Sequence, residues 1–176
     1  MAIQDSNSKK WYTGNIASWW DLQHRDLNYI NEPFNDNLSV AKWRTLGFTQ
    51  QRFTGDMYDM RFTKPDWVDG FEAYFKTWQD LSWSVYRMGP GIILPNHSDT
   101  YKKYIEIHNL ENSKNVWRAI IFLENWASGH YLEIDGVGIT DWSAGDYVAW
   151  NNDVSHLAAN MGETDRYTLQ LTGHIL

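Results

Sequence analysis

The sequence contains no cysteine. Disulfide bonds and metal sites built on thiolates are therefore excluded. The chain also lacks any apolar run close to the roughly 20 residues that span a bilayer. The stretch 1–10 is polar and has no apolar core of the kind found in secretion signals. These absences predict a soluble cytoplasmic protein without membrane contacts.

Basic residues are also in short supply, with 15 Lys and Arg against 22 Asp and Glu and a formal net charge of −7. General affinity for nucleic acid requires a basic face that attracts phosphates. We therefore expect no general binding to DNA or RNA, although a local basic patch stays compatible with this balance. The partner expected instead is a small-molecule or peptide substrate, and the oligomeric state is left open.

Large aromatic residues, in contrast, are abundant: the 176 residues include 11 Trp, 10 Tyr and 7 Phe. Such rings build either a core rich in large side chains or a binding surface. The length predicts a single domain, 1–176, with enough residues to bury a real core. No repeat, linker or low-complexity tract divides it.

The first 81 residues give the weaker signals, and we interpret them as a support region. Ser18 is a candidate cap for a helix that runs through Tyr29, and Thr54-Gly55 resembles a turn between short strands. A second helix is predicted at about 65–81, capped by Asp66. Its helically spaced aromatic residues should face a sheet: Trp67, Phe71, Tyr74, Phe75 and Trp78.

Beyond Ser82 the pattern changes to short runs of strand-forming residues separated by Gly and Asn breaks. Regularly spaced short strands of this kind indicate a β-sandwich or barrel, here over residues 82–176. The expected strands are Trp83–Met88, Ile92–Pro95, Tyr104–His108, Val116–Leu123, His130–Ile134, Tyr147–Trp150, Ser155–Ala159 and Tyr167–Leu171.

A group of polar residues in this region suggests metal chemistry. His97 and Asp99 are two residues apart, so on an extended chain they share a face, and His156 follows 59 residues later. Two imidazoles and one carboxylate form a facial triad that favours non-heme Fe(II). Arg166 and Thr168 also share a face and would clamp a carboxylate. A hairpin turning at Gly162 would place His156 and Arg166 on neighbouring strands.

The order and spacing of these residues resemble the Fe(II)/2-oxoglutarate-dependent dioxygenase superfamily, and in particular its aspartyl/asparaginyl β-hydroxylase and prolyl-hydroxylase branches. The resemblance covers about residues 83–174. It implies a mainly β (α+β) fold, a double-stranded β-helix or cupin-like jelly roll, with N-terminal buttressing helices. It also implies an oxidoreductase that hydroxylates an amino-acid or peptidyl side chain, using Fe(II), 2-oxoglutarate and dioxygen, with ascorbate as an accessory reductant.

By this resemblance, the iron ligands are His97, Asp99 and His156, and Arg166 with Thr168 binds the distal carboxylate of 2-oxoglutarate. Two further candidates for binding the co-substrate are Tyr86, which resembles a tyrosine of prolyl hydroxylases, and Arg118, which resembles a second arginine of the aspartyl/asparaginyl branch. A packed barrel aromatic is an equal alternative for Tyr86. Asp99 stands where a halide binds in related halogenases, so hydroxylation is implied rather than halogenation. His130, Tyr131 and Trp150 are candidates for the mouth of the site, with core packing as their alternative.

Two other functions remain open from the sequence. A cupin-like metal enzyme without 2-oxoglutarate, such as an isomerase or lyase, would keep the triad but have no need of Arg166 and Thr168. A Trp-rich jelly-roll lectin would explain the tryptophans and the acidic balance through stacking on sugars. It would leave the spaced His, Asp and Arg residues without a role.

Overall fold

The computed structural model describes residues 10–50, 53–61 and 63–176. The polar start predicted over 1–10 therefore lies almost wholly outside the described residues. The described chain forms two antiparallel β-sheets accompanied by few and short helices. None of these helices is long and apolar enough to cross a membrane.

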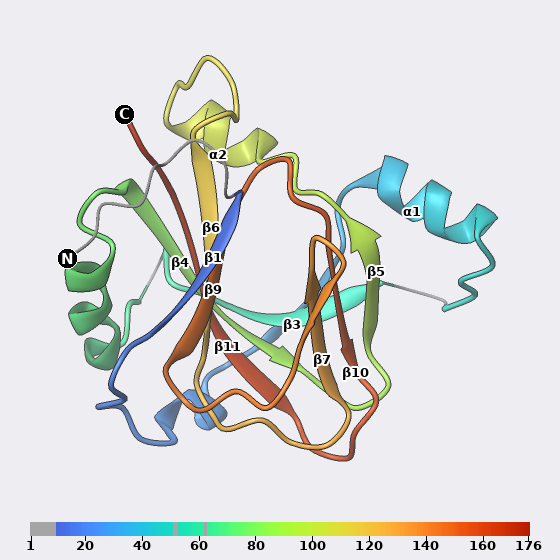
Figure 1. Ribbon diagram of the computed structural model, residues 1–176, viewed down its shortest axis with the longest axis horizontal. Helices are drawn as coiled ribbons and strands as arrows, with labels where there is room; N and C mark the ends of the chain where they lie inside the picture. Colours follow the sequence, from blue (N-terminus) through green and yellow to red (C-terminus); the bar gives the residue numbers. More distant parts are fainter. Residues whose placement is uncertain (1–9, 51–52, 62) are drawn as a thin grey trace.

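The larger sheet has seven strands in the order β1-β9-β6-β11-β4-β3-β2 (Figure 1). The N-terminal third supplies one edge strand, β1, and the pair β2 and β3 at the other edge, so it extends the sheet on both sides. The bounds are β1 Trp11–Asn15, β2 Ile30–Pro33, β3 Thr54–Asp59, β4 Gln79–Met88, β6 Val116–Phe122, β9 Asp146–Asn151 and β11 Arg166–His174.

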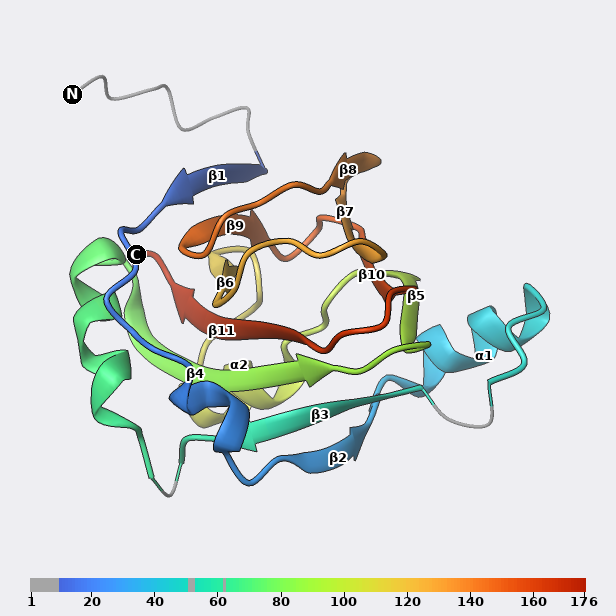
Figure 2. The ribbon, with the colours of Figure 1, turned by 90° about the horizontal axis from the view of Figure 1, so that it is seen from below.

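The smaller sheet has four strands in the order β5-β10-β7-β8, with bounds β5 Ile93–His97, β7 His130–Ile134, β8 Val137–Ile139 and β10 His156–Asn160. Figure 2 shows its strands facing the larger sheet, with helix α1 (Asn37–Thr45) projecting from the side that carries β5. A core of apolar side chains from both sheets fills part of the space between them, including Phe122, Leu132, Ile134 and Val148.

Strand β11 shows how the alternation of side chains divides the molecule. Tyr167, Leu169 and Leu171 point to the outer face of the larger sheet and join its apolar core. Arg166 and Thr168, on the other face, line a cavity between the sheets. Because both faces of this strand are covered, eight of its nine residues are buried.

The outer core is completed by the segment that was predicted as a helix over 65–81. That prediction is only partly right, because the segment forms a 3-10 helix, η2 (Asp66–Tyr74), and β4 already begins at Gln79. Asp66 is not its cap: the preceding Pro65 holds that position without a side-chain hydrogen bond. Phe71 and Phe75 are fully buried against the sheet, as expected, whereas Tyr74 remains 49% exposed.

Other local predictions were wrong because tertiary packing prevailed over local pattern. The helix expected from Ser18 to Tyr29 reduces to the 3-10 turn η1 (Gln23–Asp26), and Thr54-Gly55 opens strand β3 rather than a turn. The strand expected at Tyr104–His108 is helix α2 (Lys102–Ile107), in which the Tyr104 hydroxyl donates to the carbonyl of Asp80. Helix α1 was not predicted.

The predicted hairpin between His156 and Arg166 is also wrong. His156 begins β10, which pairs with β5 and β7, whereas Arg166 begins β11, which pairs with β4 and β6. The five residues 161–165 thus cross from one sheet to the other. The two side chains approach the same cavity from opposite sheets instead of lying on neighbouring strands.

Candidate metal centre and its cavity

The structure brings together the three residues proposed as metal ligands. His97 ends β5 and is the direct cross-strand partner of His156 on β10, so the two imidazole centroids lie 4.3 Å apart. Asp99 follows two residues after His97, and its Oδ2 lies 3.6 Å from Nε2 of His156. One ligand atom from each residue falls within 4.8 Å of the other two. Among the described residues, this is the one group of three with such spacing.

Hydrogen bonds orient both imidazoles toward a common point. Nδ1 of His97 lies 2.7 Å from the carbonyl oxygen of Pro95, and Nδ1 of His156 lies 3.1 Å from that of Val154. A carbonyl oxygen only accepts, so each Nδ1 carries the proton and each Nε2 keeps its lone pair. Burial lowers the pKa of both rings, that of His156 to about 4, so both are neutral at pH 7.

Aromatic side chains enclose the two rings. Phe34 and Trp43 meet His97 with centroids 4.8 and 5.5 Å away, and Trp150 lies 4.8 Å from His156. Trp43, on helix α1, also donates its indole N–H to the carbonyl of Asn96 at 3.0 Å. Helix α1 therefore supports the strand end that carries His97, a role that sequence reasoning missed.

Asp99 provides the anionic member of the group. Burial alone would raise its pKa, but the Arg118 guanidinium and the two imidazoles outweigh burial and lower it. Arg118 donates from Nη1 to Oδ2 of Asp99 at 2.7 Å, and its guanidinium lies 5.0 Å from the ring centroid of Tyr101. Tyr101 was also missed: it has a left-handed backbone with φ of 51°, which a tyrosine in the sequence does not signal.

The donor set of two imidazole nitrogens and one carboxylate suits a divalent first-row metal with open coordination positions. The neutral rings and the ionised carboxylate are already in the protonation states that coordination requires. The residues present therefore fit a divalent metal ion.

A cavity of about 610 Å³ opens beside the three side chains and is lined from both sheets. Arg166 lies in its wall and is only 6% exposed. Its Nη1 donates to the carbonyl oxygen of Tyr131 at 2.8 Å, but its buried Nε has no partner among the described residues. Burial lowers the pKa of Arg166 to about 10, and no carboxylate among the described residues offsets this effect.

Two hydroxyls predicted to act with Arg166 line the same cavity. Thr168 lies two residues along β11 and is the cross-strand partner of Tyr86 on β4. Burial raises the pKa of Tyr86, so its phenol is neutral and can donate a hydrogen bond. Arg118 also lines the cavity, though its guanidinium is engaged with Asp99.

The residues proposed for the mouth have different positions. Trp150 lines the cavity but is 1% exposed, and its ring packs on His156. His130 is buried with Nε2 3.0 Å from the carbonyl of Thr164, which is a packing role. Tyr131 reaches the site through its backbone oxygen, while its hydroxyl donates to Glu133.

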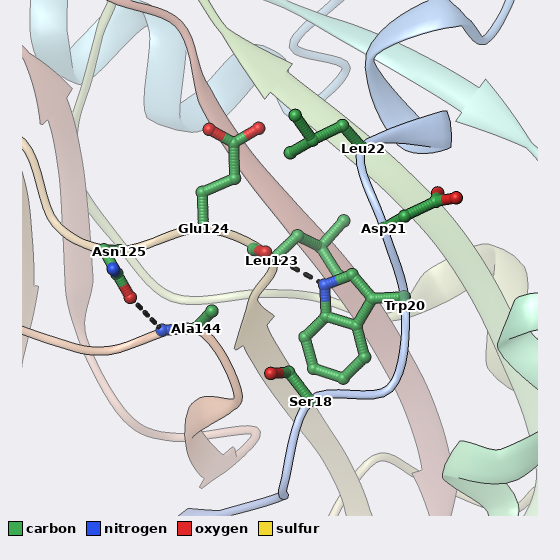
Figure 3. Close-up of a pocket in the computed structure, with 8 residues that line it drawn as sticks. All are labelled: Ser18, Trp20, Asp21, Leu22, Leu123, Glu124, Asn125 and Ala144. Carbon is green, nitrogen blue, oxygen red and sulfur yellow. Dashed lines mark hydrogen bonds between the residues drawn. The ribbon is translucent and has the colours of Figure 1, made fainter.

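A second hollow of about 470 Å³ lies on another part of the surface (Figure 3). Several of its polar groups are paired within the chain: the indole N–H of Trp20 donates to the carbonyl of Leu123, and the side-chain oxygen of Asn125 accepts from the amide of Ala144. Both carboxylate oxygens of Glu124 accept from Arg25. This hollow is a junction that fastens the N-terminal segment to the loop after β6.

Comparison with known proteins bears on the fold. No protein-family model matches the sequence, and no relative was found among curated proteins. A prolyl-4-hydroxylase from Pseudomonas putida has a similar structure, with a TM-score of 0.55 and 15% identity over 84% of this chain and 92% of that one. This chain has a double-stranded β-helix fold. The mainly β, cupin-like class expected from the sequence is thereby confirmed.

More distant similarities include a predicted oxalate decarboxylase from Thermotoga maritima, with a TM-score of 0.43 and 15% identity over 69% of this chain and 82% of that one. The cupin domain of Cnp3 from Schizosaccharomyces pombe has a TM-score of 0.43 and 9% identity over 68% of this chain and 61% of that one. At such identities the similarities concern the fold and leave the chemistry to be argued from the site.

Proposed function

We propose that this protein is a non-heme Fe(II)/2-oxoglutarate-dependent oxygenase that hydroxylates an amino-acid or peptidyl side chain. The observation that carries the proposal is Arg166, a buried cation without a carboxylate partner among the described residues, in the wall of the cavity that holds His97, Asp99 and His156. A dicarboxylate that reaches from the metal to Arg166 would supply the missing anion.

Each part of the site has a role in this proposal. His97, Asp99 and His156 would hold Fe(II), which together with 2-oxoglutarate and dioxygen supplies the oxidising chemistry. Arg166 and the hydroxyl of Thr168 would bind the distal carboxylate and thereby fix the orientation of the co-substrate. Tyr86, neutral and facing Thr168 across the strands, would donate a further hydrogen bond.

Arg118 supports the site in a different way from that suggested by the resemblance alone. Its charge is engaged by Asp99, so we assign it first to holding the metal carboxylate in place, and contact with 2-oxoglutarate second. Such a partner of a ligating carboxylate fixes its orientation and tunes its charge.

The two alternatives explain less of the site. A cupin-like enzyme that works without 2-oxoglutarate would use the metal group but leave the buried charge of Arg166 uncompensated. A sugar-binding protein would have no use for three convergent metal ligands. The similarity to a prolyl-4-hydroxylase is in keeping with the proposed substrate class.

The test is succinate formation in air with Fe(II), ascorbate, 2-oxoglutarate and a library of amino acids and short peptides. We expect wild-type protein to form succinate only with Fe(II), and a subset of the library to stimulate it. The variant Asp99→Ala should be inactive, while Asp153→Ala, at an exposed position away from the cavity, should match wild type. A wild-type protein that binds Fe(II) but forms no succinate with any library member would contradict the proposal.

A further inference from the structure

Beyond the metal and Arg166, the inner face of strands β4 and β11 continues as a row of uncharged polar side chains. Across the two strands, Ser84 pairs with Gln170 and Ser82 pairs with Thr172. All four line the cavity between the sheets. We call these four residues the polar wall.

The polar wall is unusual because its side chains have no internal partners. In the part of the chain that the structure describes, none of the four side chains forms a hydrogen bond with another residue, although Thr172 is only 6% exposed. By contrast, the buried side-chain amide of Asn160 donates to two carbonyls. Hydroxyl and amide groups that line a cavity without partners inside the protein can form hydrogen bonds with a ligand bound there.

The charges beside the polar wall are already neutralised. Arg118 is the cross-strand neighbour of Thr172 and is paired with Asp99. Asp59 is the neighbour of Ser84 and is paired with Arg61. The cross-strand neighbours of the polar wall therefore present paired charges, and the wall itself presents only neutral hydrogen-bonding groups, which suits an uncharged segment.

The spacing of the wall matches an extended peptide. Side chains on one face of a strand repeat every two residues, about 6.6–6.8 Å, and a bound chain in the extended conformation repeats its amides at the same interval. Sugars, in contrast, favour an open aromatic face. The rings of Tyr101, Tyr104 and Trp150 that line the cavity are each less than 10% exposed and are packed within the protein.

We propose that the polar wall of Ser82, Ser84, Gln170 and Thr172 binds the main chain of an extended, uncharged peptide segment. Binding there would direct one side chain of the peptide toward the metal site, because the wall and the metal ligands line one continuous cavity. This inference rests on the proposed function for its meaning, but peptide binding itself requires neither metal nor turnover and can be tested alone.

The experiment uses an array of N-acetylated octapeptides composed of Ala, Gly, Ser, Asn, Gln and Pro, probed with the labelled, metal-free protein. The affinity of the best binder is then measured by calorimetry for wild type, Gln170→Leu, Ser84→Val and Thr172→Val. Thr140→Val is the matched control, because Thr140 is exposed and lies outside the cavity. A parallel array carries neutral oligosaccharides.

We expect peptides to bind wild type and Thr140→Val equally, and each wall variant to bind roughly three- to tenfold more weakly, the usual effect of one lost neutral hydrogen bond. The affinity of the Mn(II)-loaded variants for 2-oxoglutarate should fall by a smaller factor than their affinity for peptide. Peptide binding that all wall variants retain in full overturns the inference, and so does binding of oligosaccharides alone or of neither array.

The outcomes separate this inference from the proposed function. If peptides bind through the wall but the protein forms no succinate with Fe(II), the wall assignment stands and the oxygenase proposal fails. If succinate forms but no peptide binds, the oxygenase proposal stands and the wall assignment fails.

Discussion

Two arginines of the larger sheet, the partly buried Arg118 and the buried Arg166, line the same cavity, and they differ in whether a carboxylate accompanies the charge. Arg118 on β6 donates to the carboxylate of Asp99 at 2.7 Å. Arg166 on β11 donates to a backbone carbonyl and has no carboxylate partner among the described residues, whereas the buried Nε lacks a hydrogen bond in both arginines. Burial disfavours both charges, but at Arg118 the carboxylate outweighs that effect, and its pKa is raised, whereas the pKa of Arg166 is lowered to about 10.

This difference separates a charge that the protein pairs internally from a charge that a ligand can pair. A buried guanidinium is costly unless an anion compensates it. The chain provides that anion for Arg118 and does not provide it for Arg166 within the described residues. The same comparison thus separates an internal support of the metal carboxylate from a binding site for an external carboxylate.

The largest effect is expected when Asp99 is removed, because this carboxylate serves the metal and Arg118 together. Asp99→Ala should weaken Mn(II) or Fe(II) binding by more than the roughly 10- to 100-fold caused by loss of a supporting partner. Calorimetric metal titration measures it, with Asp153→Ala as the control. Metal affinity equal to that of wild type would show that Asp99 is not a ligand.

Substitution of each arginine by Met should change the free energy of unfolding by different amounts, because only Arg118 is paired with a carboxylate. Arg118→Met leaves the carboxylate of Asp99 buried and unpaired, so we expect the free energy of unfolding to fall by roughly 3–5 kcal/mol. Arg166→Met leaves no charge unpaired and should be neutral or slightly stabilising. Urea unfolding of the metal-free proteins provides the measurement. Equal losses of unfolding free energy for the two variants would contradict the difference in pairing between Arg118 and Arg166.

Burial lowers the pKa of His156, as it lowers that of Arg166, and this predicts that the stability of the protein depends on pH. The pKa of His156 in the folded protein is about 4, below its usual 6.5, so between these values the unfolded chain binds more protons. Stability of the metal-free protein should therefore decrease as the pH falls from 6.5 to 4, by up to about 1.4 kcal/mol per pH unit from this group. His156→Asn should show a shallower slope between pH 6.5 and 4. Identical slopes for wild type and His156→Asn would contradict the lowered pKa of His156.

The smallest effect is expected at the hydroxyl beside Arg166. Thr168→Val keeps the shape and the cation but removes one neutral hydrogen bond, so affinity for 2-oxoglutarate should fall roughly three- to tenfold. Tyr86→Phe should act similarly if its phenol also contacts the co-substrate. Thr140→Val is the control in this titration. A loss of a hundredfold or more at Thr168 would mean that Arg166 is not the main contact.

The three candidate metal ligands could be predicted from the sequence because two short stretches of the chain carry the pattern. His97 and Asp99 are two residues apart, and the strand run around His156 is regular, so both faces could be assigned from alternation. Most strands beyond Ser82 were predicted for the same reason. The fold class followed from their spacing together with the resemblance.

The remaining features depend on which strands pair, and the local sequence does not specify this. Nothing in the interval between His156 and Arg166 reveals that residues 161–165 cross between sheets. The ion pair of Arg118 with Asp99 joins β6 to the segment after β5, and the polar wall exists only once β4 and β11 lie side by side. Helix α2 formed against its strand-like composition because Tyr104 is held by long-range hydrogen bonds.

The central claim, that Arg166 awaits the distal carboxylate of 2-oxoglutarate, is tested most directly by anaerobic calorimetry on Mn(II)-loaded protein. The titrants are 2-oxoglutarate and 2-oxopentanoate, which lacks the distal carboxylate. We predict that wild type prefers 2-oxoglutarate by roughly 30- to 1,000-fold, equivalent to about 2–4 kcal/mol, and that Arg166→Met loses this preference. An Arg166→Met variant that still prefers 2-oxoglutarate by the wild-type factor would contradict the account.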